Sequence, residues 1–372
     1  MLRESQAGGG RQVVKISDVA REAGTSVATV SRALNNNDRV DPELVRRVIA
    51  AAAKLGYKPN PLAQNLRRQR TNLWLLIISD IENSFFTSVA RGVEDVARQH
   101  GFSVVLCNAD EDEKKEGQYV DLAATELAAG VILSPHSAQA RVEGLTARSI
   151  PLVAIDRSLS RSVDFVTTDS RGGARAATEH LLSEGWRHPA CITGPKSAET
   201  AELRRRGYED ALRAAGLSTK QVVHQPFRVD GGRAAAAELL DRGGPPDSFF
   251  TANAALALGV LQELRSRELR PGSDIGLISF DDVPWAPFTD PPISVVSQPA
   301  YEVGAQAADL LVRRISGKLR GRAQRVVLDT DLVVRESSRR VLHAADAADP
   351  SAAGPRRAVA AGDSGAASDL GA

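Results

Sequence analysis

A short segment near the N-terminus, residues 16–35, constrains the fold more than any other part of the chain. Its first half carries small apolar residues at helical spacing, namely Val19, Ala20 and Ala23. Gly24 follows where a left-handed turn would end a short helix. Ser17 is placed to cap that helix, and Ser26 is placed to cap a second one. Because the residues between the caps are small, the two helices can cross closely.

The second of these helices divides its side chains between two faces. Its buried face would carry Val30 and Leu34, and its outward face would carry Val27, Ala28, Thr29 and Arg32. This pattern is typical of a helix-turn-helix, whose second helix enters the major groove of DNA. The alternative is an ordinary helical hairpin, and the next forty residues favour DNA binding over it.

A third helix is predicted next, with Asp41 as its cap, Pro42 in its first turn and Gly56 at its end. Its apolar stripe would consist of Leu44, Val45, Val48, Ile49, Ala52 and Leu55. Asn60 and Pro61 then form a second pair of cap and first-turn residues, in a segment too short for a stable isolated helix. We expect this hinge segment, within residues 59–71, to fold only against DNA or against its copy in a dimer.

The charge of the chain is divided unevenly between its head and its body. Residues 1–70 hold 13 lysines and arginines and 6 aspartates and glutamates, a net charge of +7. The whole chain holds 47 basic and 46 acidic residues, so residues 71–372 hold 34 basic and 40 acidic residues, a net charge of −6. A basic module of this kind can neutralise DNA phosphates, which makes binding steeply dependent on salt.

Residues 72–340 alternate short apolar runs with amphipathic helices. The runs predicted as strands are 73–78, 103–106, 130–133, 152–155, 190–193, 248–251 and 275–280. The predicted helices between them include 86–100, 116–128, 172–184, 201–215, 232–241 and 255–267. Continuous apolar strands are typical of parallel sheets covered on both faces, and ligands bind at the carboxyl ends of such strands. The length of this pattern favours two similar doubly wound lobes over one sheet.

Composition narrows the setting in which the protein is expected to act. The two cysteines, Cys107 and Cys191, lie far apart and match no metal-binding spacing, so we expect free thiols in a reducing cytoplasm. The N-terminus lacks the apolar core of a signal peptide, and no run reaches the length of a membrane span. We expect tails at residues 1–12 and 341–372 to be disordered.

Taken together, these motifs resemble those of the LacI/GalR family of transcriptional regulators over about residues 13–340. The resemblance implies a lambda-repressor-like head at 13–58 and a two-lobed body of the type I periplasmic-binding-protein fold, crossed three times by the chain. It places about 72–168 and 300–327 in one lobe, and about 169–299 and 328–340 in the other. It also implies a cytoplasmic homodimer that binds a pseudo-palindromic operator, with repression the expected outcome and the effector either an inducer or a corepressor.

Residues 27–32, Val-Ala-Thr-Val-Ser-Arg, resemble galactose-type regulators and carry the predicted base contacts. Arg32 can donate two hydrogen bonds to guanine, although a phosphate contact is its alternative role. Val27 and Ala28 would discriminate by touching thymine methyl groups. The remaining predicted DNA contacts, most of them to phosphates, are Ser17, Ser26, Thr29, Ser31, Asn35, Tyr57 and Asn60.

By the same resemblance, Leu66 is a wedge in the minor groove at the centre of the operator. Such a wedge unstacks a base step and kinks the duplex at a cost of about a few kcal/mol. The alternative is that Leu66 packs on its own domain. Ala63, one turn earlier, is small enough for two hinge helices to approach closely. The operator would then have a flexible pyrimidine–purine step at its centre.

The effector cleft is predicted mainly from the resemblance. Its expected residues lie at strand ends or in first turns of helices: Phe85, Phe86, Asp156, Arg157, Thr200, Arg204, Phe227, Asn253 and Asp281. Residues 204–208 resemble the family's Arg-x-x-Gly-Tyr. Carboxylates, guanidinium groups and an amide among aromatic rings suit a sugar-like, polyhydroxylated ligand. Three of these residues have a structural alternative: Asp281 could be a helix cap, Arg204 could form a surface ion pair, and Phe227 could belong to the core.

Two positions depart from the family pattern. Ala254 replaces the aspartate that commonly follows Asn253, which would alter the cleft or the hinge between lobes. Trp74 replaces a small residue in the first strand, which would alter packing near the dimer interface. Trp285 is a further candidate for sugar stacking or for an interface.

Two other classes of protein fit the sequence less well. A transport-type binding protein would need export and no DNA-binding head. An α/β enzyme is disfavoured because the chain lacks phosphate-binding glycine loops, a Gly-x-Ser-x-Gly element and His/Cys metal spacing. His136 and His180 could lie near a cleft, but surface positions are expected. We therefore predict no catalytic residues, no metal and no cofactor.

Overall fold

The computed structural model describes residues 14–34, 40–57 and 71–341. It divides into two compact units, Met1–Thr71 and Asn72–Ala372, called here the head and the body. The hinge helix, both predicted tails except Val341, and the predicted contacts Asn35, Asn60, Ala63 and Leu66 lie outside the described residues.

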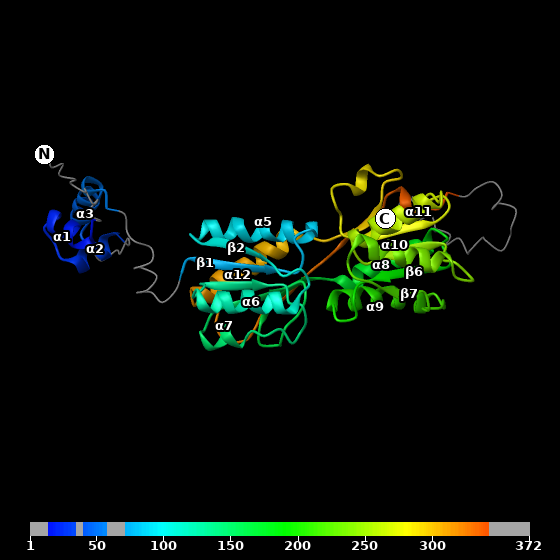
Figure 1. Cartoon of the computed structure of the whole chain (residues 1–372), viewed down its shortest axis with the longest axis horizontal. Helices are drawn as coiled ribbons and strands as arrows, with labels where there is room; N and C mark the ends of the chain where they lie inside the picture. The colour runs from blue at the N-terminus through cyan, green and yellow to red at the C-terminus, as the bar shows by residue number, and fades with distance from the viewer. Residues whose placement is uncertain (1–13, 35–39, 58–70, 342–372) are drawn as a thin grey trace, which may run out of the picture. The chain divides into compact units, whose positions relative to one another are not determined.

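Three helices form the head: α1 (Ile16–Glu22), α2 (Val27–Leu34) and α3 (Pro42–Leu55) (Figure 1). Gly24 has a φ of +61° between α1 and α2, as predicted. The Ser26 hydroxyl accepts the Thr29 N–H at 3.1 Å, which caps α2, and the Asp41 carboxylate accepts two N–H groups of α3. Gly56 ends α3 with a φ of +64°. These local predictions are confirmed.

Two local predictions in the head are wrong. Ser17 does not cap α1, because the cap is Lys15, two residues earlier, and the Asp18 carboxylate accepts the Lys15 N–H at 2.9 Å. Ile49 is not buried and keeps 53% of its surface exposed. It lies beside the narrow stripe of α3 that contacts the other helices, a stripe centred on Val48 and Ala52.

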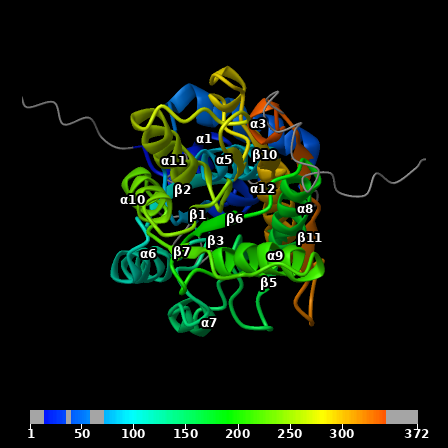
Figure 2. The same cartoon turned by 90° about the vertical axis from the view of Figure 1, so that its right-hand side faces the viewer.

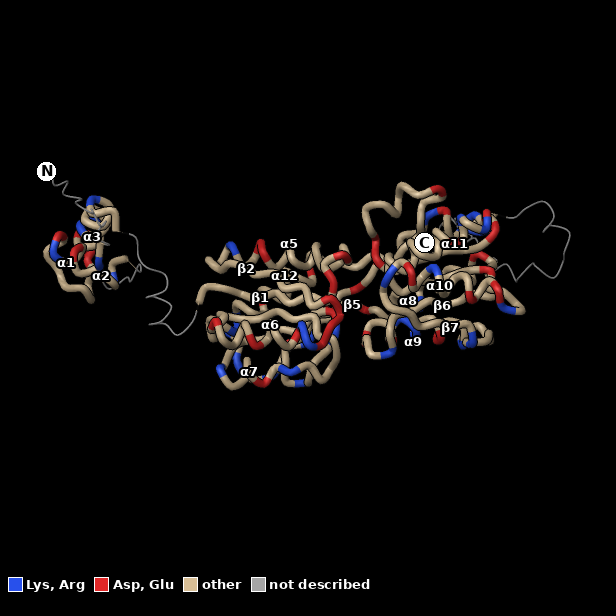
Figure 3. The backbone as a smooth tube through the Cα atoms, in the orientation of Figure 1, with Lys and Arg blue, Asp and Glu red and all other residues tan. Residues whose placement is uncertain are grey.

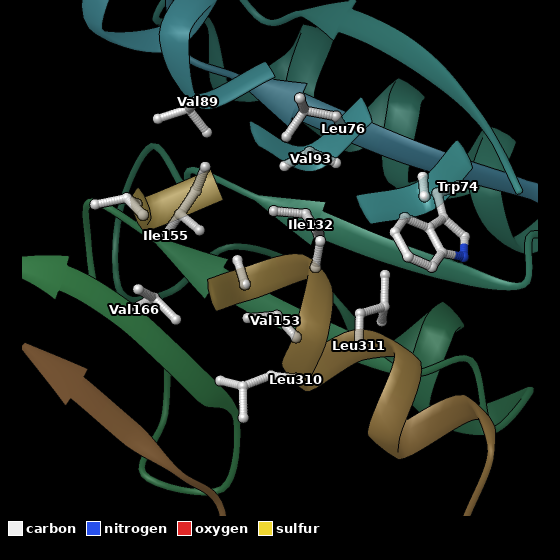
Figure 4. Packing of buried hydrophobic residues seen from close by; sticks show 14 of the residues in the cluster. Trp74, Leu76, Val89, Val93, Ile132, Val153, Ile155, Val166, Leu310 and Leu311 are labelled. Carbon is white, nitrogen blue, oxygen red and sulfur yellow. The ribbon is translucent and has the colours of Figure 1, made fainter. Parts of the chain in front are cut away.

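The first lobe of the body is built on a six-stranded parallel sheet with the order β11-β5-β4-β3-β1-β2. Its strands are β1 (Leu73–Ile78), β2 (Ser103–Asn108), β3 (Gly130–Leu133), β4 (Leu152–Ile155), β5 (Asp164–Thr168) and β11 (Arg325–Leu328). Helices α5 (Ser84–Gln99) and α12 (Ala300–Ile315) cover one face, and α6 (Glu113–Thr125) and α7 (Glu143–Ala147) cover the other. Figure 4 shows the core beneath α5 and α12.

The second lobe repeats this plan with the order β12-β10-β9-β8-β6-β7. Its strands are β6 (Pro189–Thr193), β7 (Val222–His224), β8 (Ser248–Thr251), β9 (Gly276–Phe280), β10 (Ser294–Ser297) and β12 (Asp331–Val333). Helices α8 (Ser170–Ser183) and α9 (Glu199–Ala214) pack on one face, and α10 (Val229–Leu240) and α11 (Ala254–Ser266) on the other (Figure 2). Only β12 is antiparallel among the strands of the described chain. Two short 3-10 helices, Ala286–Phe288 and Glu336–Ser338, complete it.

The chain crosses between the two sheets after β5, after β10 and after β11. The predicted fold class, a small helical head with a two-lobed body of parallel sheets, is therefore confirmed. The sequence analysis missed five strands: β5, β7, β10, β11 and β12. These strands are short, and most mix polar with apolar residues, so their pairing partners define them more than their own pattern does.

Trp74 is fully buried in β1 and stacks on Phe102 with ring centroids 4.8 Å apart. Figure 4 places it beside Leu311 at one end of the core cluster. Among the described residues, its indole N–H has no hydrogen-bond partner. Both cysteines, Cys107 and Cys191, are buried and free, as predicted.

Candidate functional site

The head presents the outward face of α2 as its candidate DNA-binding surface. Val27 is 44% exposed, and Ala28 and Arg32 are also exposed. Thr29 is half-buried, and its hydroxyl lies 2.9 Å from that of Ser26. The head thus brings the expected base-reading side chains onto one surface.

Not every predicted phosphate contact lies on that surface. Ser31 is only 8% exposed and lies between Val30 and Ala33 of the head's core, so the structure gives no support to a phosphate contact there. The buried face of α2 includes Val30, Ser31 and Ala33, so it is wider than the sequence pattern suggested. Ser17 is exposed in the first turn of α1, and Tyr57 is half-buried against the core of the head.

The body contains a cavity of about 520 Å³ lined by residues of both lobes. All nine residues predicted for the effector cleft line it: Phe85, Phe86, Asp156, Arg157, Thr200, Arg204, Phe227, Asn253 and Asp281. They meet because the carboxyl ends of parallel strands in each sheet face the other sheet. We call this cavity the cleft.

Two aspartates occupy equivalent places in the two lobes. Asp156 follows β4 and Asp281 follows β9, and both have positive φ values, 63° and 76°. Asp281 accepts a hydrogen bond from the Gln298 amide at 2.5 Å and another from the Ala254 backbone. Among the described residues, the Asp156 carboxylate has no hydrogen-bond donor, and its nearest cation is Arg157 Nε at 3.5 Å from Oδ2. Beside this ion pair, the Asp156 carboxylate can still accept hydrogen bonds from a ligand.

Burial shifts the titration of both aspartates. It raises the pKa of Asp156 to about 6, although the charges of Arg157 and Arg204 oppose the shift. It also raises the pKa of Asp281, against the opposing charge of Arg204 and the hydrogen bond from Gln298. Removing a carboxylate from water disfavours its charged form, which explains both directions.

Arg157 is 4% exposed and is held by Glu111. Its Nη1 and Nη2 donate to the two Glu111 oxygens at 2.7 and 2.5 Å. Burial alone would lower the pKa of the guanidinium, but the hydrogen bonds and charge of Glu111 outweigh burial and raise it. The Nε atom of Arg157 is buried and, within the described chain, has no hydrogen-bond partner.

Arg204 is a buried cleft residue, which excludes its alternative role in a surface ion pair. Its Nη1 donates to the Ala252 carbonyl at 2.6 Å, and its guanidinium lies 3.8 Å from the centre of the Phe280 ring. Burial lowers its pKa, while Asp281 and Asp156 oppose that shift. Arg204 thus both lines the cleft and supports the ends of β8 and β9.

The remaining predicted residues supply an amide, a hydroxyl and aromatic rings. The Asn253 side-chain oxygen accepts the Leu256 N–H at 2.9 Å and caps α11, so only its amide nitrogen is left for a ligand. Thr200 is buried in the first turn of α9. Phe85 and Phe86 meet edge to face and belong also to the first lobe's core, whereas Phe227 is half-buried against the second lobe's core.

The two departures from the family pattern differ in their positions. Ala254 lines the cleft, so no third carboxylate lies at that position beside Asp281. Trp285 also lines the cleft from the second lobe, next to Pro284. Trp74 lies in the first lobe's core, and it is not among the residues that line the cleft.

Sequence reasoning missed two residues that organise the cleft, Glu111 and Gln298. Glu111 lies in a turn of positive φ after β2, and the rule that functional side chains follow strands could have found it. Gln298 follows β10, which was not recognised as a strand. Gln298 links the two lobes: its side-chain amide donates to Asp281 of the second lobe, and its side-chain oxygen accepts from the hydroxyl of Thr168 in the first lobe.

No group of histidine, cysteine or acidic residues in the described ranges could hold a metal ion. His136 lies near the cleft, with Nδ1 3.7 Å from a Glu111 oxygen, and His180 shares a hydrogen bond with Ser338 in the second lobe. Within residues 14–34, 40–57 and 71–341, no helix is both long and apolar enough to cross a membrane.

Comparison with known proteins gives the family. A family model described as bacterial regulatory proteins of the lacI family matches residues 15–60, and a periplasmic binding protein-like domain matches 178–338. The ribose operon repressor of Halalkalibacterium halodurans is 34% identical over 87% of this chain and 97% of its own length. The transcriptional repressor CytR of Escherichia coli is 32% identical over 87% and 96%.

Solved structures agree with these relatives. A complex of the transcriptional regulator CelR with cellobiose has a TM-score of 0.66 and 32% identity, and covers 87% of this chain and 99% of that one. The lac repressor dimer bound to operator and the anti-inducer ONPF has a TM-score of 0.76 and 24% identity over 88% and 99%, which shows the shared fold. The helix-turn-helix head, the two-lobed body and these relatives lead to one conclusion: the chain belongs to the LacI family of DNA-binding transcription regulators, which are not enzymes.

Proposed function

We propose that the protein is a repressor that binds a pseudo-palindromic operator as a homodimer and responds to a sugar-like effector in the cleft. The observation that carries this proposal is the cleft itself, where side chains from both lobes surround one cavity lined by the Asp156 carboxylate, which is ion-paired with Arg157 at 3.5 Å. As a DNA-binding regulator it would act in the cytoplasm, without a cofactor and without a membrane partner.

Operator recognition is assigned to the outward face of α2 and to the hinge. Arg32 would donate to guanine, and Val27 and Ala28 would contact thymine methyl groups in the major groove. Exposed or half-buried polar residues of the head, Ser17, Ser26, Thr29 and Tyr57, would fix the head on phosphates. Asn35 retains its predicted DNA contact, and Asn60, Ala63 and Leu66 retain the roles predicted for them in the hinge segment.

The cleft chemistry favours a ligand with many hydroxyl groups. Asp156 can accept hydrogen bonds, whereas the Asn253 amide can donate them, so neighbouring hydroxyls of one sugar could be bound together. Aromatic rings from both lobes, Phe85 and Trp285 among them, offer faces for sugar stacking. The volume lies within the range of small-molecule sites and accommodates a mono- or disaccharide. The names of the relatives, which include a ribose operon repressor and a cellobiose-bound regulator, support the same class.

The two lobes also touch at the edge of this region, which suggests how binding is transmitted. Ser158 of the first lobe donates from its N–H and its hydroxyl to Glu199 at the start of α9, at 2.5 and 2.8 Å. A ligand that contacts both lobes favours one angle between them over others. We propose that this angle sets the spacing of the two hinges of a dimer, and so the affinity for the operator.

The test of the DNA-binding part is selection of duplexes from a random library by the full-length protein. We expect enrichment of an inverted repeat. Arg32→Ala should lower affinity for that repeat by about 10- to 100-fold and relax one base position, because one bidentate contact contributes about 1–3 kcal/mol. Arg21→Ala, an exposed arginine on α1, is the matched control and should weaken all duplexes alike. If no duplex is enriched, the proposed function is wrong.

A further inference from the structure

The two buried guanidinium groups of the cleft, on Arg157 and Arg204, are already in use, whereas the third, on Arg228, is exposed. Both Nη groups of Arg157 are bonded to Glu111, and Arg204 is bonded to the Ala252 carbonyl and stacked on Phe280. A bidentate pair between guanidinium and carboxylate is the same arrangement that a phosphate ligand would require. Glu111 therefore occupies the position that an anionic ligand would need.

The lining as a whole has an excess of acidic side chains. Six carboxylates line the cleft, against three guanidinium groups: Asp80, Glu82, Glu111, Asp156, Asp230 and Asp281 against Arg157, Arg204 and Arg228. Figure 3 shows acidic positions gathered along the edge of the first lobe that faces the second. In a site partly shielded from water, this excess opposes the approach of an anion.

Four helices begin at the cleft, and helix N-termini normally attract anions. Here each of these N-termini already has a capping side chain or an acidic residue of this chain beside it. Asn83 caps α5 and Asn253 caps α11 through their side-chain oxygens. Helices α9 and α10 carry Glu199 and Asp230 in their first turns. A phosphate would therefore meet acidic side chains at α9 and α10, and at α5 and α11 it would compete with the asparagine caps for backbone N–H groups.

We propose that Glu111 determines the charge specificity of the cleft: by holding Arg157 it restricts the effector to uncharged polyhydroxylated molecules and excludes their phosphate esters. This inference rests on the proposed effector role of the cleft. To bind a phosphate at Arg157, the protein would have to displace Glu111 and break two charge-assisted hydrogen bonds, which is unfavourable. A neutral hydroxyl group can instead donate to the Asp156 carboxylate, which does not have to release a hydrogen-bond donor.

The experiment compares full-length wild type, Glu111→Gln and Glu82→Gln. Glu82→Gln is the matched control, because it removes the same charge from the lining and does not touch Arg157. Each protein is titrated with inorganic phosphate and with D-ribose 5-phosphate, and binding is followed by calorimetry and by tryptophan fluorescence, since Trp285 lines the cleft. D-ribose is titrated beside its phosphate ester.

We expect neither anion to bind the wild type or Glu82→Gln at millimolar concentrations. Glu111→Gln should gain affinity for at least one anion by about 10- to 100-fold, the effect of a freed charge-assisted hydrogen bond. Binding of either anion to the wild type, no gain in Glu111→Gln, or an equal gain in Glu82→Gln would each overturn the inference. If Glu111→Gln does not fold, the wild-type titrations still decide it. A failure of sugars to change operator binding would count against the proposed function and leave this anion test standing.

Discussion

Asp156→Asn is expected to stabilise the unliganded body at neutral pH. The substitution keeps the size of the side chain and removes a buried charge that no hydrogen-bond donor of the described chain satisfies. Burial raises the pKa of Asp156 from 3.8 to about 6, so the folded protein binds this proton more tightly than the unfolded chain does. Asp156 therefore destabilises the folded state wherever it is ionised, and asparagine has no such cost.

The expected size follows from the two pKa values. A difference of about two units corresponds to about 3 kcal/mol, since each unit contributes about 1.4 kcal/mol. Below about pH 3 the residue is protonated in both states, and the two proteins should be equally stable. The cost to the wild type grows as pH rises from about 4 to about 6 and is then constant, with about half of it present at pH 5.

Urea unfolding of the full chain, followed by tryptophan fluorescence, measures this difference. All three tryptophans, Trp74, Trp186 and Trp285, lie in the body, so the signal excludes the head. We expect Asp156→Asn to exceed the wild type by about 3 kcal/mol at pH 7.5 and by about half as much at pH 5. Asp230→Asn, an exposed carboxylate of the same cleft, should change stability by less than about 0.5 kcal/mol at both values. A wild type that is as stable as Asp156→Asn at pH 7.5 would refute the reasoning.

Two further predictions concern the head and the hinge. Gly24→Ala should destabilise the head by about 1 kcal/mol, because Gly24 has a φ of +61° and an added methyl group would lie 3.1 Å from Arg47. Amide hydrogen exchange within residues 14–57 measures this loss of stability. Unchanged protection from exchange would contradict the prediction. Leu66→Ala should weaken binding to the selected operator far more than binding to random duplex, as titrations of both DNAs would show, whereas an equal loss would exclude the wedge.

The local features of the head could be predicted because few interactions decide them. Ser26, Asp41 and Gly56 act through hydrogen bonds and dihedral angles within a few residues of themselves. The prediction for Ser17 failed because the helix is capped two residues earlier, at Lys15, whose N–H donates to the Asp18 carboxylate. The burial of Ser31 and the exposure of Ile49 depend on how three helices pack, which spacing alone does not specify.

The cleft could be predicted as a set of residues but not as a network. Asp156 and Asp281 were found because both follow apolar strands of two parallel sheets, whose carboxyl ends face each other. The partners that decide their chemistry come from elsewhere in the chain. Glu111 lies 46 positions before Arg157, and Gln298 lies 17 positions after Asp281. No local pattern indicates that both Nη groups of Arg157 donate to Glu111, whereas the Asp156 carboxylate has no hydrogen-bond donor among the described residues.

The central claim is that a molecule bound in the cleft changes the affinity of the head for DNA. The most direct measurement is the dissociation constant of full-length protein for its selected operator, with and without each sugar of a panel, in the wild type and in Asp156→Asn. The account predicts that at least one uncharged sugar shifts the wild-type constant by 5-fold or more, in the range typical of allosteric coupling, and that Asp156→Asn largely abolishes the shift. Sugar binding in the cleft that leaves operator affinity unchanged would contradict it.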